Sequence, residues 1–125
     1  MTAPVWMNAV IGDFGRAAKI GGLALNERGA AALKFENGTS LRLEYTGEEL
    51  VVEMTVRSAD VKRLLSLAHP RARYGFRVRA GIVPKTHEAV IAVRLAERDV
   101  TLPRVNGAFE VLWRLSGEIG GATWA

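Results

Sequence analysis

Residues 22–53 read GLALNERGAAALKFENGTSLRLEYTGEELVVE, and this stretch decides the fold. Asn37-Gly38 separates two runs of alternating apolar and polar residues and predicts a β-hairpin with a type I′ turn, which needs positive φ at both central residues. Thr46-Gly47 predicts a second turn. The apolar positions of the resulting strands are Ala31, Leu33, Phe35, Leu41, Leu43, Tyr45, Leu50, Val52, Met54 and Val56. Because these positions alternate with polar ones, the stretch predicts an antiparallel meander with one apolar face that other elements must cover.

A helix is predicted before the meander, from Pro4 to about Ile20, with its stop at Gly21-Gly22. Its apolar residues recur at spacings of three and four, and they are Trp6, Val10, Ile11, Phe14, Ala17 and Ala18. The simplest interpretation is that this stripe packs against the sheet. The alternative is that Trp6 and Val10 stay partly exposed and receive a segment of a partner.

In the second half of the chain, the residue pattern predicts a short helix, two more strands and a final helix. Ser58 caps the short helix and Pro70 stops it, whereas Leu102-Pro103 opens the last helix, which runs to Gly117. The predicted strands are 71–81 and 88–95, joined by a loop from Gly81 to His87. The element order is α-β-β-β-α-β-β-α, which predicts one α+β domain over residues 1–125, a twisted antiparallel sheet covered by helices.

Positive charge is concentrated in the second half of the chain. The 125 residues carry a net charge of +4, with 6 bases and 8 acids in residues 1–60 but 11 bases and 5 acids in residues 61–125. The predicted basic face comprises Arg71, Arg73, Arg77 and Arg79. Nucleic acid, an acidic protein partner or solubility could each explain it. Tyr74 is the only evident aromatic candidate for base stacking, so a solvated or acidic-partner face is favoured over nucleic acid.

No pattern in the sequence supports catalysis, a metal site or a cofactor. There is no cysteine, and the two histidines, His69 and His87, lack the spacing of metal ligands. The glycines do not form a phosphate-binding loop. No apolar run is long enough to span a membrane, and no signal sequence is evident, so we expect an unprocessed cytoplasmic protein.

Residues 20–44 resemble the opening motif of the Tir chaperone (CesT-like) family, the class I chaperones of bacterial type III secretion. The family pattern is similar to GLxxLxLDExGxxxLxFDDGxxVxLE, and this chain matches it at Gly29, Gly38, Leu33 and Phe35, with Asn26 where aspartate is usual. Residues 92–95 resemble the family's strand that ends in an arginine-leucine pair. Residues 109–113 are similar to its final helix, whose aromatic face covers the sheet. Members of this family are usually acidic, whereas this chain is basic.

The resemblance implies a non-catalytic chaperone that holds the N-terminal segment of an effector or regulatory substrate extended and export-competent. Apolar surfaces would take its side chains, and a sheet edge could accept it as a strand. The implied candidates for substrate binding, or else for the core, are Trp6, Val10, Leu33, Phe35, Leu41, Leu43 and Val52. The implied dimer interface comprises Val61, Leu64, Leu65, Phe76 and Val78. The expected assembly is a homodimer, or a heterodimer with an acidic sister chaperone, and the alternative function is a basic nucleic-acid-binding or regulatory module.

Overall fold

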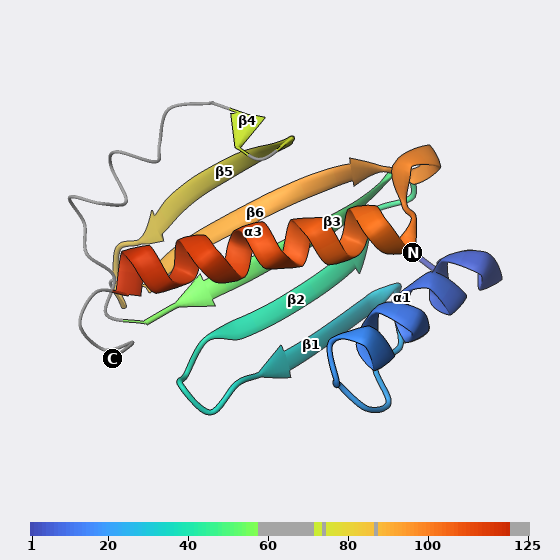
Figure 1. The fold of residues 1–125 in the computed structure, drawn as a ribbon, viewed down its shortest axis with the longest axis horizontal. Helices are drawn as coiled ribbons and strands as arrows, with labels where there is room; N and C mark the ends of the chain where they lie inside the picture. Colours follow the sequence, from blue (N-terminus) through green and yellow to red (C-terminus); the bar gives the residue numbers. More distant parts are fainter. Residues whose placement is uncertain (58–71, 74, 87, 121–125) are drawn as a thin grey trace.

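The protein folds into one twisted antiparallel sheet that is covered on one face by two helices (Figure 1). The structure is a computed structural model that describes residues 1–57, 72–73, 75–86 and 88–120. The six strands lie in the order β1-β2-β3-β6-β5-β4. The elements are α1 (Val5–Ala17), β1 (Ala30–Lys34), β2 (Ser40–Tyr45), β3 (Glu49–Val56), β4 (Ala72–Arg73), β5 (Phe76–Val83), β6 (Glu88–Ala96), the 3-10 turn η1 (Glu97–Asp99) and α3 (Leu102–Gly120). The predicted α+β class and helix-covered sheet are confirmed. The predicted helix over 58–70 lies outside the described residues.

Burial alternates strictly along the central strands, as the apolar pattern predicts. β3 and β6 bury every second residue, and the buried set faces α3. Leu41, Leu43 and Tyr45 of β2 extend the same core, whereas Ala31 and Leu33 of β1 are only partly buried because β1 lies at the edge. The opposite face of the sheet carries the polar positions and no helix among the described residues (Figure 1).

The turn between β1 and β2 differs from the predicted type I′ geometry. Only Gly38 has a positive φ, 90°, and Asn37 does not. The Gly38 N–H donates to the Phe35 carbonyl at 3.0 Å, and the Asn37 Oδ1 accepts from the Thr39 N–H at 2.9 Å. The loop is therefore a type I turn followed by a left-handed glycine. The type I′ prediction was wrong because the Asn37 side chain bonds the backbone two residues on and holds a wider loop.

The buried face of α1 keeps Ile11 and Phe14 of the predicted stripe but is shifted toward Met7. Met7 is fully buried together with Ile11 and Phe14, at spacings of four and three, whereas Trp6 is 46% exposed and Ala17 is exposed. The prediction of Trp6 and Ala17 as core was wrong, since the i, i+4, i+7 series starting at Met7 faces α3 and the sheet.

The boundaries of later elements also shift. The predicted strand over 71–81 is two strands, with Gly75 at φ 82° between them, and β5 continues to Val83, into the predicted loop. α1 ends at Ala17, before a left-handed Lys19 (φ 60°), rather than at Gly21-Gly22. The final helix runs to Gly120, three residues beyond the predicted end. Boundaries of this kind depend on tertiary contacts that a local pattern does not contain.

Close contact between α3 and β5 fixes the helix on the sheet. A Cβ at Gly107 would lie 2.9 Å from the Phe76 Cζ atom, so the absence of a side chain lets the ring pack against the helix backbone. The Arg104 guanidinium stacks over the same ring, with its Cζ 4.2 Å from the centroid, and donates from Nη1 to the Gly75 carbonyl at 3.4 Å. These contacts join the start of α3 to the β4–β5 turn.

Candidate partner-binding surface

The outer edge of β1 carries unpaired backbone groups. Gly29 and Phe35 flank the strand, and their backbone hydrogen bonds go to Tyr45 and Thr39 of the β2 side. Because pairing alternates along an antiparallel ladder, the backbone N–H and C=O groups of Ala31 and Leu33 also point toward β2. Those of Ala30, Ala32 and Lys34 point outward, away from β2. For Ala32 and Lys34, these outward groups have no partner within the described part of the chain. Such an edge is a ready template for an added strand.

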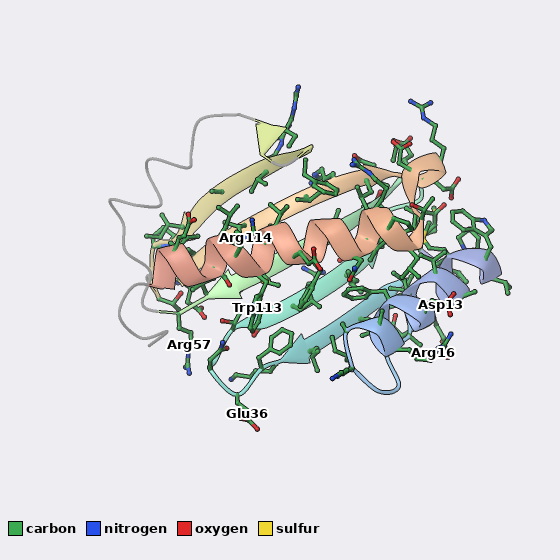
Figure 2. The ribbon with its side chains drawn as sticks, viewed as in Figure 1. Asp13, Arg16, Glu36, Arg57, Trp113 and Arg114 are labelled. Carbon is green, nitrogen blue, oxygen red and sulfur yellow. The ribbon has the colours of Figure 1, made fainter. Side chains whose placement is uncertain are left out.

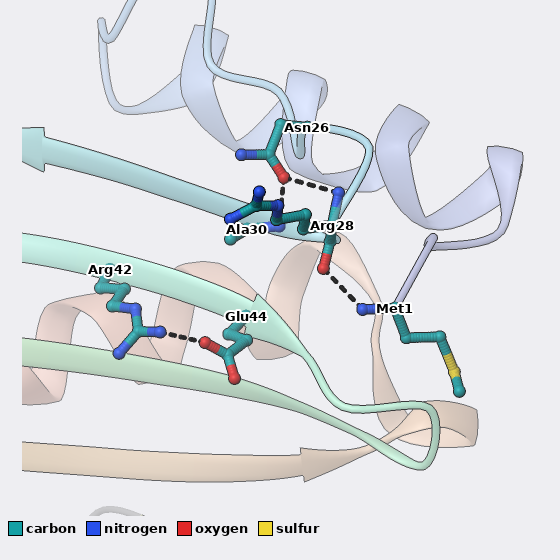
Figure 3. Close-up of polar contacts among 6 residues, drawn as sticks. All are labelled: Met1, Asn26, Arg28, Ala30, Arg42 and Glu44. Carbon is teal, nitrogen blue, oxygen red and sulfur yellow. Dashed lines mark hydrogen bonds and ion pairs between the residues drawn. The ribbon is translucent and has the colours of Figure 1, made fainter.

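The loop before β1 closes one end of this edge. The Asn26 Oδ1 accepts hydrogen bonds from the N–H groups of Arg28 at 2.9 Å and Ala30 at 3.1 Å (Figure 3), and the Ala30 carbonyl accepts from the Asn26 N–H at 2.8 Å. Asn26 uses its side chain here as an acceptor, the role that an aspartate would also fill. The open part of the edge therefore begins at Ala32.

A row of four aromatic rings runs from the core to the surface beside this edge. Phe14 of α1 and Phe109 of α3 are 5.3 Å apart between centroids, Phe109 and Trp113 are 5.9 Å apart, and Phe35 is 5.0 Å from Trp113. Phe14 is fully buried, Phe35 and Phe109 are partly buried, and Trp113 is 37% exposed. Figure 2 shows Trp113 projecting from α3 toward β1 and β2. Together with Leu33, the rings Phe35, Phe109 and Trp113 form what we call the apolar strip.

The structure separates the predicted substrate-binding residues into two groups. Leu41, Leu43 and Val52 are at most 1% exposed and belong to the core. Leu33 and Phe35 are partly buried at the β1 edge, Val10 is partly buried on α1, and Trp6 is exposed. For this second group, substrate binding stays a prediction, and the exposure of Trp6 matches the alternative in which it stays accessible. Sequence reasoning assigned Phe109 and Trp113 to the cover of the sheet only, although their spacing of four already placed two aromatic rings on one helix face.

The predicted dimer-interface residues within the described part of the chain lie in the protein's own core. Phe76 is 7% and Val78 3% exposed, under α3, so their side chains are not available at the surface of this chain. Val61, Leu64 and Leu65 lie outside the described residues. The involvement of this region in a dimer remains a prediction.

Two of the four predicted basic-face residues are placed on the uncovered face of the sheet. Arg77 and Arg79 are exposed and alternate with the buried Phe76 and Val78. Arg71 lies outside the described residues, and for Arg73 only the backbone is described. The outward positions of the described strands hold no aromatic residue, so this face lacks the stacking platform of a single-strand nucleic-acid site.

Among the titratable groups in the described part of the chain, one contact, between Tyr45 and Glu97, stands out. Among the described residues, no three side chains of the metal-ligating types gather, and both histidines lie outside the described residues. The Tyr45 hydroxyl donates to the Glu97 carboxylate and lies 3.1 Å from the Gly47 carbonyl. The hydrogen bond to Glu97 raises the pKa of Tyr45, and burial and the negative charge of Glu97 add to the rise. This contact ties the end of β2 to η1.

The helix-covered sheet has an open edge with an adjacent apolar strip, a combination that can accept an extended polypeptide. Residues 6–120 match the family described as Type III secretory system chaperone SycN. The chain belongs to this family, and the expected class of secretion chaperone is confirmed. No curated protein matches the chain.

Solved structures with the same fold are distant in sequence. A chain of the ExsC–ExsE complex is 18% identical with a TM-score of 0.75, and the alignment covers 98% of this chain and 97% of that one. A chain of the complex of the Yersinia pestis type III secretion chaperone SycH with a fragment of YscM2 is 14% identical with a TM-score of 0.70, and the alignment covers 90% of this chain and 98% of that one. A chain of the ExoT–SpcS complex from Pseudomonas aeruginosa is 13% identical with a TM-score of 0.68, and the alignment covers 94% of this chain and 99% of that one. These likenesses establish the fold.

No helix within the described residues has the length and apolar character needed to cross a membrane.

Proposed function

We propose that this chain is a non-catalytic cytoplasmic chaperone that binds the N-terminal segment of a type III secretion effector or regulatory substrate and keeps it extended for export. The open edge of β1 beside the apolar strip is the observation that carries this proposal. An extended segment paired to Ala32 and Lys34 would gain backbone hydrogen bonds from the edge, and every second side chain could rest on Leu33, Phe35 and Trp113. The family match and the complexes among the structural neighbours support the same function.

The chemistry of the surface suits a holding role. Strand pairing is insensitive to side-chain identity, and rings on a fixed scaffold accept varied apolar residues. Ordering a disordered segment is entropically costly, so a second bound region is expected to offset that cost. We propose a homodimer, with a heterodimer as the alternative, because two copies would double the surface that one segment can contact. Light scattering should then give twice the chain mass of 13.6 kDa.

A proline at position 32 tests the edge directly. The Ala32 N–H points away from β2, so Ala32→Pro removes no bond of the sheet but eliminates an edge donor and blocks a pairing strand. The control Ala32→Thr keeps the N–H and suits a strand. Each variant is co-expressed with the products of neighbouring genes, and the affinity for a retained substrate is measured by calorimetry.

We expect Ala32→Pro to weaken substrate binding about tenfold, the equivalent of one or two backbone hydrogen bonds, and Ala32→Thr to stay within about twofold of the parent. Trp113→Gln should weaken binding by a similar factor through the apolar strip. Hydrogen exchange should locate the protected part of the substrate in its N-terminal region. Unchanged binding by Ala32→Pro, with its melting temperature retained, would show that the substrate does not pair with β1.

A further inference from the structure

The uncovered face of the sheet carries a cluster of arginines with too few carboxylates. Arg77 and Arg79 of β5 and Arg94 of β6 line one hollow of about 180 Å³, and Glu49 of β3 is the only acidic residue among the described residues that line it. The Arg94 Nη1 atom donates a hydrogen bond to the Glu49 Oε1 atom at 3.2 Å, so these two residues form an ion pair. Within the described residues, Arg77 and Arg79 have no ion-pair partner. We call Arg77, Arg79 and Arg94 the arginine cluster.

The strand register places these like charges beside one another. Val78 pairs with Val93 and Arg79 with Ala92, so Arg77 and Arg94 each follow the last pair of this ladder, and both line the same hollow. Like charges directly opposite each other on a sheet are destabilising. The Arg77 and Arg79 side chains are exposed and can turn toward a ligand, whereas Arg94, whose side chain is 52% exposed, is held by Glu49. A bound anion would relieve the repulsion and fill the donor capacity of the guanidinium groups.

The shape around the cluster favours an extended polypeptide. Arg77 and Arg79 are two positions apart on one strand, about 6.7 Å, and carboxylates at alternate positions of an extended peptide have the same spacing. The next outward position of β5 is Gly81, where a Cβ would meet no atom within 4 Å. Gly81 pairs with the half-buried Val90 of β6. A low apolar floor therefore continues along the line of the two arginines.

Charge is balanced on the neighbouring strands. A second hollow of about 130 Å³ shares Arg94 and is lined by Glu44, Glu53 and the aliphatic Val51, with Arg42 held in an ion pair by Glu44. With two carboxylates and two guanidinium groups, this hollow adds no net positive charge for a long polyanion such as nucleic acid, and the described outward positions of the strands offer no ring for base stacking. A short acidic run laid along β5 needs only the hollow of the arginine cluster.

We propose that the arginine cluster binds a short acidic segment of a polypeptide, laid extended along β5 with alternate carboxylates on Arg77 and Arg79. This inference goes beyond the proposed function, because it concerns the face that the helices leave uncovered and does not involve β1 or the apolar strip. Guanidinium groups favour such a ligand, since each can bind a carboxylate with two parallel hydrogen bonds.

The test uses a labelled peptide of about eight alternating glutamates and threonines, with a glutamine-threonine peptide as the uncharged control. Binding to the full chain is measured by fluorescence anisotropy at about 50 mM and 200 mM salt. The variant is Arg77→Ala/Arg79→Ala. The matched control, Arg16→Ala/Arg57→Ala, removes the same charge at two exposed sites away from β5, both labelled in Figure 2.

We expect the acidic peptide to bind, the glutamine peptide not to bind, and the double variant in the cluster to weaken binding about tenfold, the sum of two exposed charge contacts. The control should change it less than twofold. Equal losses in both double variants, or no binding of the acidic peptide, would overturn the proposal. A thymidine oligonucleotide serves as the third probe. If it binds more tightly than the peptide and loses affinity in the cluster variant, the site is one for nucleic acid and the proposal fails.

Discussion

Replacing Gly107 with alanine tests how closely α3 is seated on β5. The substitution adds one methyl group at a point where the Phe76 Cζ would be 2.9 Å away and the Cε2 3.1 Å away. Carbon atoms in good contact are about 3.5–4.0 Å apart, so the ring or the helix must move by about half an ångström. Because the Arg104 guanidinium stacks on the same ring, the movement also disturbs that contact.

Two opposing contributions set the magnitude. Alanine is favoured over glycine inside a helix by about 1 kcal/mol. Overpacking a well-filled site costs about 1–3 kcal/mol, and we take the middle of that range. The net expectation is that Gly107→Ala lowers the free energy of unfolding by about 1 kcal/mol. Gly117→Ala is the matched control in the same helix, since a Cβ there meets nothing within 4 Å, and we expect it to raise the free energy of unfolding by about 0.5–1 kcal/mol.

Urea unfolding followed by circular dichroism measures both variants at one protein concentration. The two should differ by about 2 kcal/mol, or roughly 8 °C in melting temperature for a domain of this size. In a Phe76→Leu background, Gly107→Ala should lose its penalty, because the ring that it strikes is gone. If Gly107→Ala is as stable as Gly117→Ala, then Phe76 does not pack against the α3 backbone and the reasoning is refuted.

Two further predictions concern polar contacts at the ends of the strands. Asn26→Ala should lower the free energy of unfolding by about 1 kcal/mol, because the Arg28 and Ala30 N–H groups lose their acceptor. The control Asn26→Asp keeps an acceptor and should stay within about 0.5 kcal/mol of the parent. Equal losses of both variants in urea unfolding would contradict this prediction. Tyr45→Phe should lower the free energy of unfolding at neutral pH, because the hydrogen bond to Glu97 is lost. The raised pKa of Tyr45 means that its stabilisation is complete below about pH 10 and is lost as pH rises through the raised value, so the parent should lose more stability than Tyr45→Phe as the pH rises above about 10.

The sequence predicted the strands of the meander and their buried residues because alternation reports burial directly. Each of Leu50, Val52 and Met54 is fully buried, as their spacing of two requires. The pattern did not predict the turn type at Asn37-Gly38, because the Asn37 side chain accepts a hydrogen bond from the Thr39 N–H and stabilises a different turn. It also misplaced the face of α1, because Trp6 and Met7 are both apolar and only the packed structure shows which of them faces α3.

The candidate surface was only partly predictable. Leu33 and Phe35 follow from the family resemblance, but Leu41, Leu43 and Val52 alternate in the same way and belong to the core. A strand's position in the sheet decides between these outcomes, and the order β1-β2-β3-β6-β5-β4 is not encoded in any local pattern. The arginine cluster likewise depends on β5 lying beside β6, although the positive charge of the second half was evident.

Within the described ranges, both helices lie on one side of the sheet, so the apolar strip and the arginine cluster lie on opposite sides of a layer one backbone thick (Figure 1). A single partner carrying an apolar segment and an acidic segment could occupy both if its connecting residues pass around the sheet. The second contact would then form at an effective concentration fixed by the length of that connection, reaching the millimolar range when it is short and flexible. Two weak sites would give a long-lived complex, and releasing either segment would make the whole partner easy to detach.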